Sequence, residues 1–211
     1  MELTVLGATG RTGRQVVRQA LDAGHGVTAV VRDRAGLRVD GSRLRVVTAD
    51  VMDPHGLTPA IEGRDAVISA LGPHGRGPTV VCSGGVHAAV EAMHATGVRR
   101  IVAVSAAPVA PLPPGEPLLM RRFVDPLIRR AFANVYADLT VMEEALRMGD
   151  YDWTVVRPPR LSDKPLTGVY RSATDGAVPH GRSISRADLA HAVLDVLQAP
   201  DTIRTAVAIA Y

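Results

Sequence analysis

Short apolar runs alternate with longer segments of helical period along the whole chain. The runs that predict strands span residues 3–6, 27–31, 44–47, 66–69, 100–104, 153–156 and 205–209. The segments that predict helices span residues 11–23, 54–61, 80–96, 118–148 and 186–198. The first six strands are continuously apolar rather than alternating, which indicates strands covered on both faces. The pattern predicts an α/β fold of Rossmann type, a doubly wound parallel sheet with strand order 3-2-1-4-5-6 in a single domain over residues 1–211.

Two irregular stretches interrupt this alternation. Residues 107–117 are rich in proline, which excludes a helix or a central strand there. Residues 158–182 contain Pro158, Pro159 and Gly168 and show no clear period. Because the first stretch follows the fifth strand, where ligands bind in such sheets, we expect residues 106–134 and 158–182 to form a cap on the substrate side.

Composition narrows the class of protein. Basic residues exceed acidic ones by 24 − 21 = 3 and form no long run, so a nucleic-acid partner is not expected. No stretch approaches 18 apolar residues, and the first residues lack the features of a signal peptide, so neither a membrane span nor export is expected. The single cysteine, Cys82, excludes an intramolecular disulfide, and we expect a buried structural thiol and a cytoplasmic protein.

A glycine-rich loop follows the first strand directly. It reads Gly7-Ala8-Thr9-Gly10-Arg11-Thr12-Gly13 and opens the first helix. Gly7 permits the tight turn, Gly10 lets the backbone approach a pyrophosphate, and Gly13 lets the helix pack closely on the sheet. The N–H groups at the start of the helix, with hydroxyl groups of Thr9 and Thr12, suit phosphate binding. The loop therefore predicts a dinucleotide site.

The second strand ends in Arg32-Asp33-Arg34, where dehydrogenases that prefer NAD carry an acidic residue for the ribose. A guanidinium at position 32 suits the 2′-phosphate of NADP, and Arg11 and Arg34 are further candidates for the same group. We therefore expect NADP(H) to be preferred over NAD(H). The alternative is that Arg32 is a surface residue and Asp33 binds the ribose.

Two later strand ends complete the predicted cofactor site. Asp50 and Val51 follow the third strand, where a carboxylate suits the adenine amino group, although Asp50 also suits a turn. The small residues of Ala70-Leu71-Gly72 after the fourth strand leave room for the nicotinamide half.

Ordinary short-chain dehydrogenases use a Tyr-x-x-x-Lys pair, in which the lysine lowers the pKa of the tyrosine. The only lysine here is Lys164, preceded four residues earlier by Arg160, and Tyr136 is followed four residues later by Thr140. The pair is absent, so conventional carbonyl reduction is not expected. A flavin or another conjugated acceptor accepts hydride directly and takes its proton from water. Tyr136 is a candidate acid, with helix packing as the alternative.

Several blocks of sequence together resemble the atypical short-chain dehydrogenase/reductases of the NmrA-like and biliverdin reductase B (flavin reductase) type. They are Gly-Ala-Thr-Gly-x-Thr-Gly at 7–13, Val-Arg-Asp at 31–33, Ala-Leu-Gly at 70–72, Arg-Pro-Pro at 157–159, Pro-Leu-Thr-Gly-x-Tyr at 165–170 and Ile-Ser-x-x-Asp-Leu at 184–188. The resemblance implies the cofactor contacts Gly7, Thr9, Gly10, Arg11, Thr12, Gly13, Arg32, Asp50, Val51, Leu71, Gly72 and Pro158. It also implies that Ser105 lies beside the nicotinamide, and it makes Arg160, where the reductase branch carries histidine, a substrate candidate.

These observations lead to one main hypothesis and two alternatives. The main hypothesis is an NADPH-dependent reductase that transfers hydride to a flavin, a quinone or another conjugated small molecule, with Ser105 and Tyr136 as candidate catalytic residues and a monomer or homodimer as its state. The first alternative is a non-catalytic NADP(H) sensor, in which Phe123, Leu127 or Phe132 fills the substrate pocket. The second is an NAD(P)-dependent epimerase, which normally needs the absent pair. The seven histidines show no metal-ligand spacing, and Glu143-Glu144 reads as a solvated helix edge.

Overall fold

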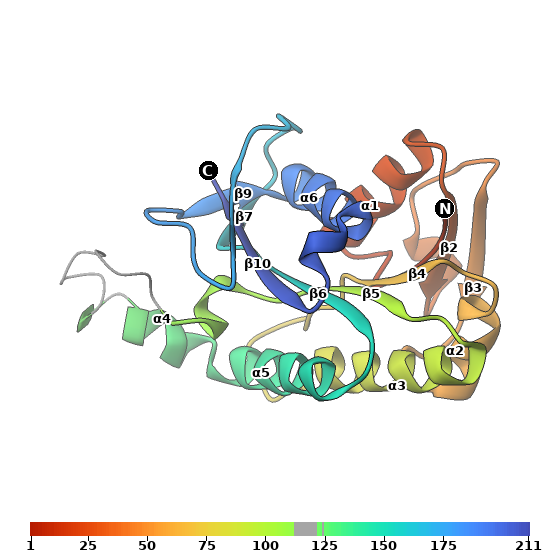
Figure 1. The fold of residues 1–211 in the computed structure, drawn as a ribbon, viewed down its shortest axis with the longest axis horizontal. Helices are drawn as coiled ribbons and strands as arrows, with labels where there is room; N and C mark the ends of the chain where they lie inside the picture. The colour runs from red at the N-terminus through yellow and green to blue at the C-terminus, as the bar shows by residue number, and fades with distance from the viewer. Residues whose placement is uncertain (112–121, 124) are drawn as a thin grey trace.

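The computed structural model describes residues 1–111, 122, 123 and 125–211. In this part of the chain, eight strands form one sheet that lies between two layers of helices (Figure 1). The strands of this sheet are β1 (Glu2–Leu6), β2 (Gly26–Val31), β3 (Leu44–Thr48), β4 (Ala66–Ser69), β5 (Arg100–Val104), β6 (Asp152–Arg157), β8 (Arg171–Thr174) and β10 (Thr205–Ala210). Two short strands, β7 (Arg160–Ser162) and β9 (Ser183–Ser185), pair with each other in parallel.

The strand order is β3-β2-β1-β4-β5-β6-β10-β8. The predicted order of the first six strands is therefore confirmed, and β10 extends the sheet in parallel beyond β6. The last strand, β8, is antiparallel to β10 and closes that edge. Because the first six strands and β10 run in one direction, their carboxyl ends lie along one edge of the sheet, where this class of fold binds its ligands.

Helices α1 (Arg11–Asp22) and α6 (Arg186–Gln198) cover one face of the sheet, and α2 (Pro54–Ile61), α3 (Val81–Thr96) and α5 (Ala133–Met148) cover the other (Figure 1). Each helix turns an apolar stripe to the sheet. In α1 the buried positions are Gly13, Val16, Val17 and Ala20, which recur at helical spacing. The core consequently has two large apolar clusters, one on each side of the sheet, and a small third cluster of Val178, Ala208 and Ala210.

Three features differ from the sequence prediction. The helix expected over 118–148 is divided, within the described residues, into α4 (Asp125–Ala131) and α5, because Phe132 takes a non-helical conformation between them. Residues 118–121 and 124 lie outside the described part. Strand β3 is only half buried, since it lies at the edge of the sheet and has one neighbouring strand. The stretch 158–182, expected to be irregular, contributes β7 and β8.

No helix in the described residues is long and apolar enough to cross a bilayer.

Candidate cofactor and acceptor site

The three glycines of the loop between β1 and α1 occupy different environments. Gly7 has a φ of +74°, and a Cβ there would lie 2.6 Å from the Ala70 carbonyl oxygen. A Cβ on Gly13 would lie 2.1 Å from the Gly7 carbonyl oxygen. Gly10 differs from both, because its φ of −68° is ordinary and it is exposed. Gly7 and Gly13 are thus required by the fold, whereas the fold alone places a weaker demand on Gly10.

The N-terminus of α1 is open to a ligand. Gly10 is the N-cap residue, and no side chain in the described residues caps this helix. Its first-turn N–H groups and the positive end of its dipole therefore face the loop unneutralised. This cradle of the loop and the open helix end fits the pyrophosphate of a dinucleotide.

A first cavity of about 620 Å³ lies at the carboxyl ends of β1, β2, β3 and β4. Its volume is in the usual range for a small-molecule site. The predicted cofactor residues that line it are Gly7, Thr9, Gly10, Arg32, Asp50, Val51, Ala70, Leu71 and Gly72. Four strand ends thus bring together residues that are up to 65 positions apart in the chain (72 − 7).

The charged residues at the ends of β2 and β3 are Arg32, Asp33 and Asp50, and each has a different partner. The Nη2 atom of Arg32 lies 3.1 Å from Nε2 of His74, and both residues line the first cavity. Asp33 caps the short turn that follows, because its Oδ1 accepts a hydrogen bond of 3.0 Å from the Ala35 N–H. Asp50 lines the first cavity, and its Oδ1 accepts a hydrogen bond of 3.0 Å from the Met52 N–H.

Six of the predicted cofactor residues are not among those that line the first cavity; Ser105 and Pro158 are described below, and the other four here. Arg11 is exposed and forms an ion pair with Asp163, and Thr12 lies on the first turn of α1. Gly13 is buried beneath the Gly7 carbonyl group. Arg34 is exposed and begins a 3₁₀ turn, Arg34–Gly36.

A second cavity of about 670 Å³ lies at the carboxyl ends of β5, β6 and β10. The predicted residues Tyr136, Pro158 and Arg160 line it. Burial raises the pKa of Tyr136 above its ordinary value, with smaller and opposing effects of Arg129 and Asp125. The phenol is therefore protonated at neutral pH and can donate a hydrogen bond.

Ser105 occupies a position that the sequence did not anticipate. It is 6% exposed, lies among the lining residues of neither cavity, and its Oγ donates a hydrogen bond of 2.6 Å to Oε1 of Glu143. Glu143 is completely buried, so its interpretation as a solvated helix edge is wrong. It also binds Arg157 through two hydrogen bonds and Arg147 through one. Burial works to raise the pKa of Glu143, but the hydrogen bonds from Arg157 and Ser105 and both cationic charges lower it overall.

A second buried carboxylate caps a helix. Asp138 of α5 accepts hydrogen bonds of 2.9 Å from the backbone N–H groups of both Cys82 and Ser83, at the start of α3. The loop before α3 is also fixed to α5, because the Arg76 guanidinium stacks 4.4 Å from the Phe132 ring centroid. Burial, followed by the charge of Asp138, raises the pKa of the Cys82 thiol to about 12, so this thiol is structural, as expected.

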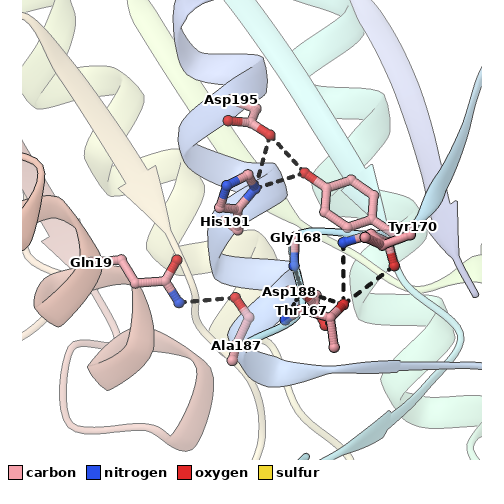
Figure 2. A network of polar contacts seen from close by, with 9 residues as sticks. Gln19, Thr167, Gly168, Tyr170, Ala187, Asp188, His191 and Asp195 are labelled. Atoms are coloured by element: carbon pink, nitrogen blue, oxygen red, sulfur yellow. Dashed lines mark hydrogen bonds and ion pairs between the residues drawn. The ribbon is translucent and has the colours of Figure 1, made fainter. Parts of the chain in front are cut away.

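The Pro-Leu-Thr-Gly-x-Tyr block at 165–170 anchors a loop to α6 (Figure 2). The N–H groups of Thr167 and Gly168 donate to the carboxylate of Asp188 at 2.9 and 2.8 Å. The Tyr170 hydroxyl donates to Asp195 at 2.6 Å and lies 3.0 Å from Nδ1 of His191. Burial and Asp195 raise the pKa of Tyr170. This block therefore supports the site rather than contributing to it directly.

Two sets of residues at the cavities were missed by sequence reasoning. The segment 72–79, which includes His74, lines the first cavity, and its glycine and proline content directly after β4 was an available signal. Arg157 lines the second cavity from the end of β6. A charged residue that ends an apolar strand was the signal there. No group of three or more potential metal ligands is present in the described ranges.

The model of a known family matches residues 7–200, which is nearly the whole chain, and its description is NAD(P)H-binding. The chain belongs to the NAD(P)H-binding family. The match begins at the first glycine of the loop, so this NAD(P)H-binding protein carries the cofactor cradle within the matched region.

Several curated proteins are similar to this NAD(P)H-binding protein. An uncharacterised chloroplastic protein of Arabidopsis thaliana is 30% identical over 207 residues, covering 92% of this chain and 70% of the relative. The divinyl chlorophyllide a 8-vinyl-reductase of Zea mays is 28% identical over 225 residues, covering 95% of this chain and 53% of the relative. Photosystem II assembly factor Ycf39 of Synechocystis is 44% identical over 73 residues. The chain spans 22% of Ycf39 and about half of the maize enzyme.

Solved structures share the fold. A short-chain dehydrogenase/reductase of Veillonella parvula, crystallised in complex with NADP, superposes with a TM-score of 0.81 at 19% identity, covering 100% of this chain and 94% of that one. At this level of identity the likeness shows the fold alone. The family match confirms the NAD(P)H-binding family that the resemblance implied, and the solved structure confirms the Rossmann-type fold.

Proposed function

We propose that this NAD(P)H-binding protein is a reductase that transfers hydride from NADPH to a conjugated small molecule such as a quinone or a flavin. One observation carries the proposal. The first and second cavities lie along the same carboxyl edge of the sheet, the first over β1–β4 and the second over β5, β6 and β10. In such folds a dinucleotide extends along this edge, so its nicotinamide end is directed toward the second cavity.

NADP(H), when bound, supplies a hydride that leaves it as a pair of electrons with one proton. The chain supplies the binding groups. The open N-terminus of α1 suits the pyrophosphate, and Asp50 suits a polar group of the adenosine half. The second cavity is lined mainly by apolar side chains, which exclude water and orient a planar acceptor.

We propose NADPH as the preferred cofactor because Arg32 lines the first cavity at the end of β2. Asp33, the competing ribose ligand, already has a carboxylate oxygen bound to the Ala35 N–H. Nε2 of His74 accepts a hydrogen bond from Nη2 of Arg32, because a guanidinium has no acceptor atom. Charge-assisted hydrogen bonds from the remaining N–H groups of Arg32 favour a phosphate over a hydroxyl group.

The alternatives receive less support. A sensor with a filled pocket is disfavoured, because Phe123 and Leu127 are 62% and 69% exposed and the second cavity remains open beside Phe132. An epimerase is disfavoured because Tyr136 has no lysine four residues later and its pKa is raised rather than lowered. One relative is itself named a vinyl-reductase, which agrees with reduction of a conjugated group.

Steady-state oxidation of NADPH tests the proposal. The purified protein is mixed with NADPH and, in turn, a quinone, a flavin and a conjugated enone, and the loss of NADPH absorbance is followed against a blank without protein. We expect turnover with at least one acceptor. Binding of NADPH without turnover of any acceptor contradicts the reductase and leaves the sensor.

A further inference from the structure

Arg157, which lines the second cavity, has a guanidinium group that is hydrogen-bonded through one side only. Arg157 ends β6, its side chain is 9% exposed, and it lines the cavity. Its Nε donates 3.0 Å to Oε1 of Glu143, and its Nη2 binds Oε2 of the same carboxylate. A guanidinium carries five N–H donors, so this two-point pair uses only two of them. The Nη1 atom makes no hydrogen bond to any described residue.

The buried carboxylate holds this group in one orientation. Glu143 is completely buried and stays ionised, since Ser105, Arg157 and Arg147 all donate to it. The bidentate geometry fixes the plane of the Arg157 guanidinium. The two arginines and one carboxylate leave an excess of one positive charge beside the cavity. The orientation and the excess charge together prepare Nη1 to receive an anion.

The Nη1 donor of Arg157 lies at a cavity whose other lining residues are mainly apolar. Apolar residues dominate its lining, including Phe132 and the segment Ala208, Ile209 and Ala210. An unpaired donor in apolar surroundings binds a charged oxygen more strongly than it would in water. The group is thus suited to a ligand that is mainly apolar and carries one negatively charged oxygen.

The other charged residues that line the second cavity neither repel an anion at Arg157 strongly nor replace Arg157 as its partner. Asp125 is bound by Arg129 at 2.7 Å, and Arg186 is bound by Asp163 at 2.7 Å. Arg160 and Arg182 are exposed and form no ion pair with the described residues. No unpaired carboxylate in the described lining therefore opposes an anion, and the two exposed arginines add positive potential at the rim.

We propose that the second cavity binds a conjugated molecule with an oxygen at Nη1 of Arg157, and that Arg157 favours this oxygen in its negatively charged form. The role in catalysis rests on the proposed function. The hydride adds to a carbon of the conjugated system, the displaced π electrons collect on its oxygen, and a proton from water then neutralises that oxygen. Arg157 keeps its proton and stabilises the negative charge as it develops. Glu143 and Ser105 position Arg157.

Binding of a stable oxyanion tests this subsite without any turnover. The probe is 2-hydroxy-1,4-naphthoquinone, whose hydroxyl group is ionised at neutral pH, and the comparison ligand is 1,4-naphthoquinone. Titration calorimetry measures the Kd of each for the NADP⁺-loaded protein. We expect the ionised probe to bind about tenfold to a hundredfold more tightly than the neutral quinone. Equal affinities, or no binding of the ionised probe, would overturn the subsite.

Two matched variants assign the effect to Arg157. Arg157→Lys keeps a cation beside Glu143 but removes the fork, and we expect it to lose at least about tenfold in affinity for the ionised probe alone. Arg147→Lys changes another partner of Glu143 that does not line the cavity, and it should bind both probes like the wild type. If Arg157→Lys folds poorly, the neutral pair Glu143→Gln with Arg157→Gln replaces it. An equal loss in both lysine variants, or a loss only in Arg160→Ala or Arg182→Ala, would refute the assignment.

The same variants separate this inference from the proposed function. With an acceptor that is turned over, Arg157→Lys should lower kcat by about tenfold or more while the KM for NADPH stays unchanged. If the wild type binds the ionised probe but reduces no acceptor, the reductase proposal fails and the subsite stands. If turnover and probe binding both survive Arg157→Lys unchanged, the subsite fails and the reductase stands.

Discussion

The glycine loop allows a test in which neighbouring positions give opposite results. A Cβ on Gly13 would lie 2.1 Å from a backbone oxygen, which cannot move aside without disturbing the turn. We therefore expect Gly13→Ala to cost about 2–3 kcal/mol of stability, or about 4–12 °C in Tm. A Cβ on Gly10 would lie 3.1 Å from the Gly7 carbonyl oxygen, and the backbone there is already acceptable for alanine. The small cost of a poorer N-cap is offset by a less flexible unfolded chain, so Tm should change by about 2 °C or less.

At position 10 we expect a small effect on stability but a large effect on the affinity for the cofactor. A methyl group in the cradle displaces the pyrophosphate from the N–H groups of Arg11 and Thr12. Each charge-assisted hydrogen bond lost costs about 1.5–3 kcal/mol, or about tenfold to a hundredfold in Kd. Gly10→Ala should thus weaken NADPH at least about tenfold, and Gly10→Val should abolish measurable binding.

Thermal unfolding without cofactor and fluorescence titration with NADPH measure the two effects separately. The reasoning is refuted if folded Gly10→Val binds NADPH like the wild type. It is also refuted if Gly10→Ala loses as much thermal stability as Gly13→Ala, because the glycine at position 10 would then serve the fold.

Three further predictions address charge and burial. Arg32→Ala should weaken NADPH by about tenfold to a hundredfold and leave NADH nearly unchanged, and an equal loss for both in paired titrations would make Arg32 a support of the fold. The hydrogen bonds to Asp188 outweigh its burial and lower its pKa from 3.8 to about 2, so it stabilises the fold above about pH 4 and loses this effect as the pH falls toward 2. Asp188→Asn should therefore cost about 2 kcal/mol at pH 7 in urea unfolding, with a gap that narrows in acid; a constant gap contradicts the assignment. Cys82, with a thiol pKa of about 12, should react with a disulfide reagent only after denaturation, and rapid labelling of the native protein would show that it is accessible.

The elements that sequence predicted best are those whose pattern has a single physical explanation. Continuous apolar runs predicted the first six strands, and their alternation with helices predicted the fold class that has this strand order. The glycine spacing located the loop in which a Cβ at position 7 or 13 would collide with backbone. The pairing of strands beyond β6 was not predictable in this way, because β8 is a short, largely exposed strand without a hydrophobic signal.

The polar interior was the least predictable part. Glu143 and Glu144 are adjacent and chemically alike, yet one is completely buried and the other is exposed. The difference depends on Ser105 and Arg157, which lie 38 and 14 residues away in the chain. Local sequence contains no record of such partners. For the same reason, the ion pair that draws Arg11 toward Asp163 was not foreseen.

The carboxylate of Asp138 has a consequence for the direction in which a dinucleotide lies. Two helices, α1 and α3, begin at the first cavity, and both ends would attract a phosphate if left bare. Asp138 satisfies the first N–H groups of α3 and cancels its positive end, whereas α1 keeps its own. An entering diphosphate therefore meets one attractive helix end and one neutralised end. We therefore expect the diphosphate of a bound dinucleotide to lie at the start of α1 rather than at the start of α3, so that Asp138 helps to set the direction of the cofactor.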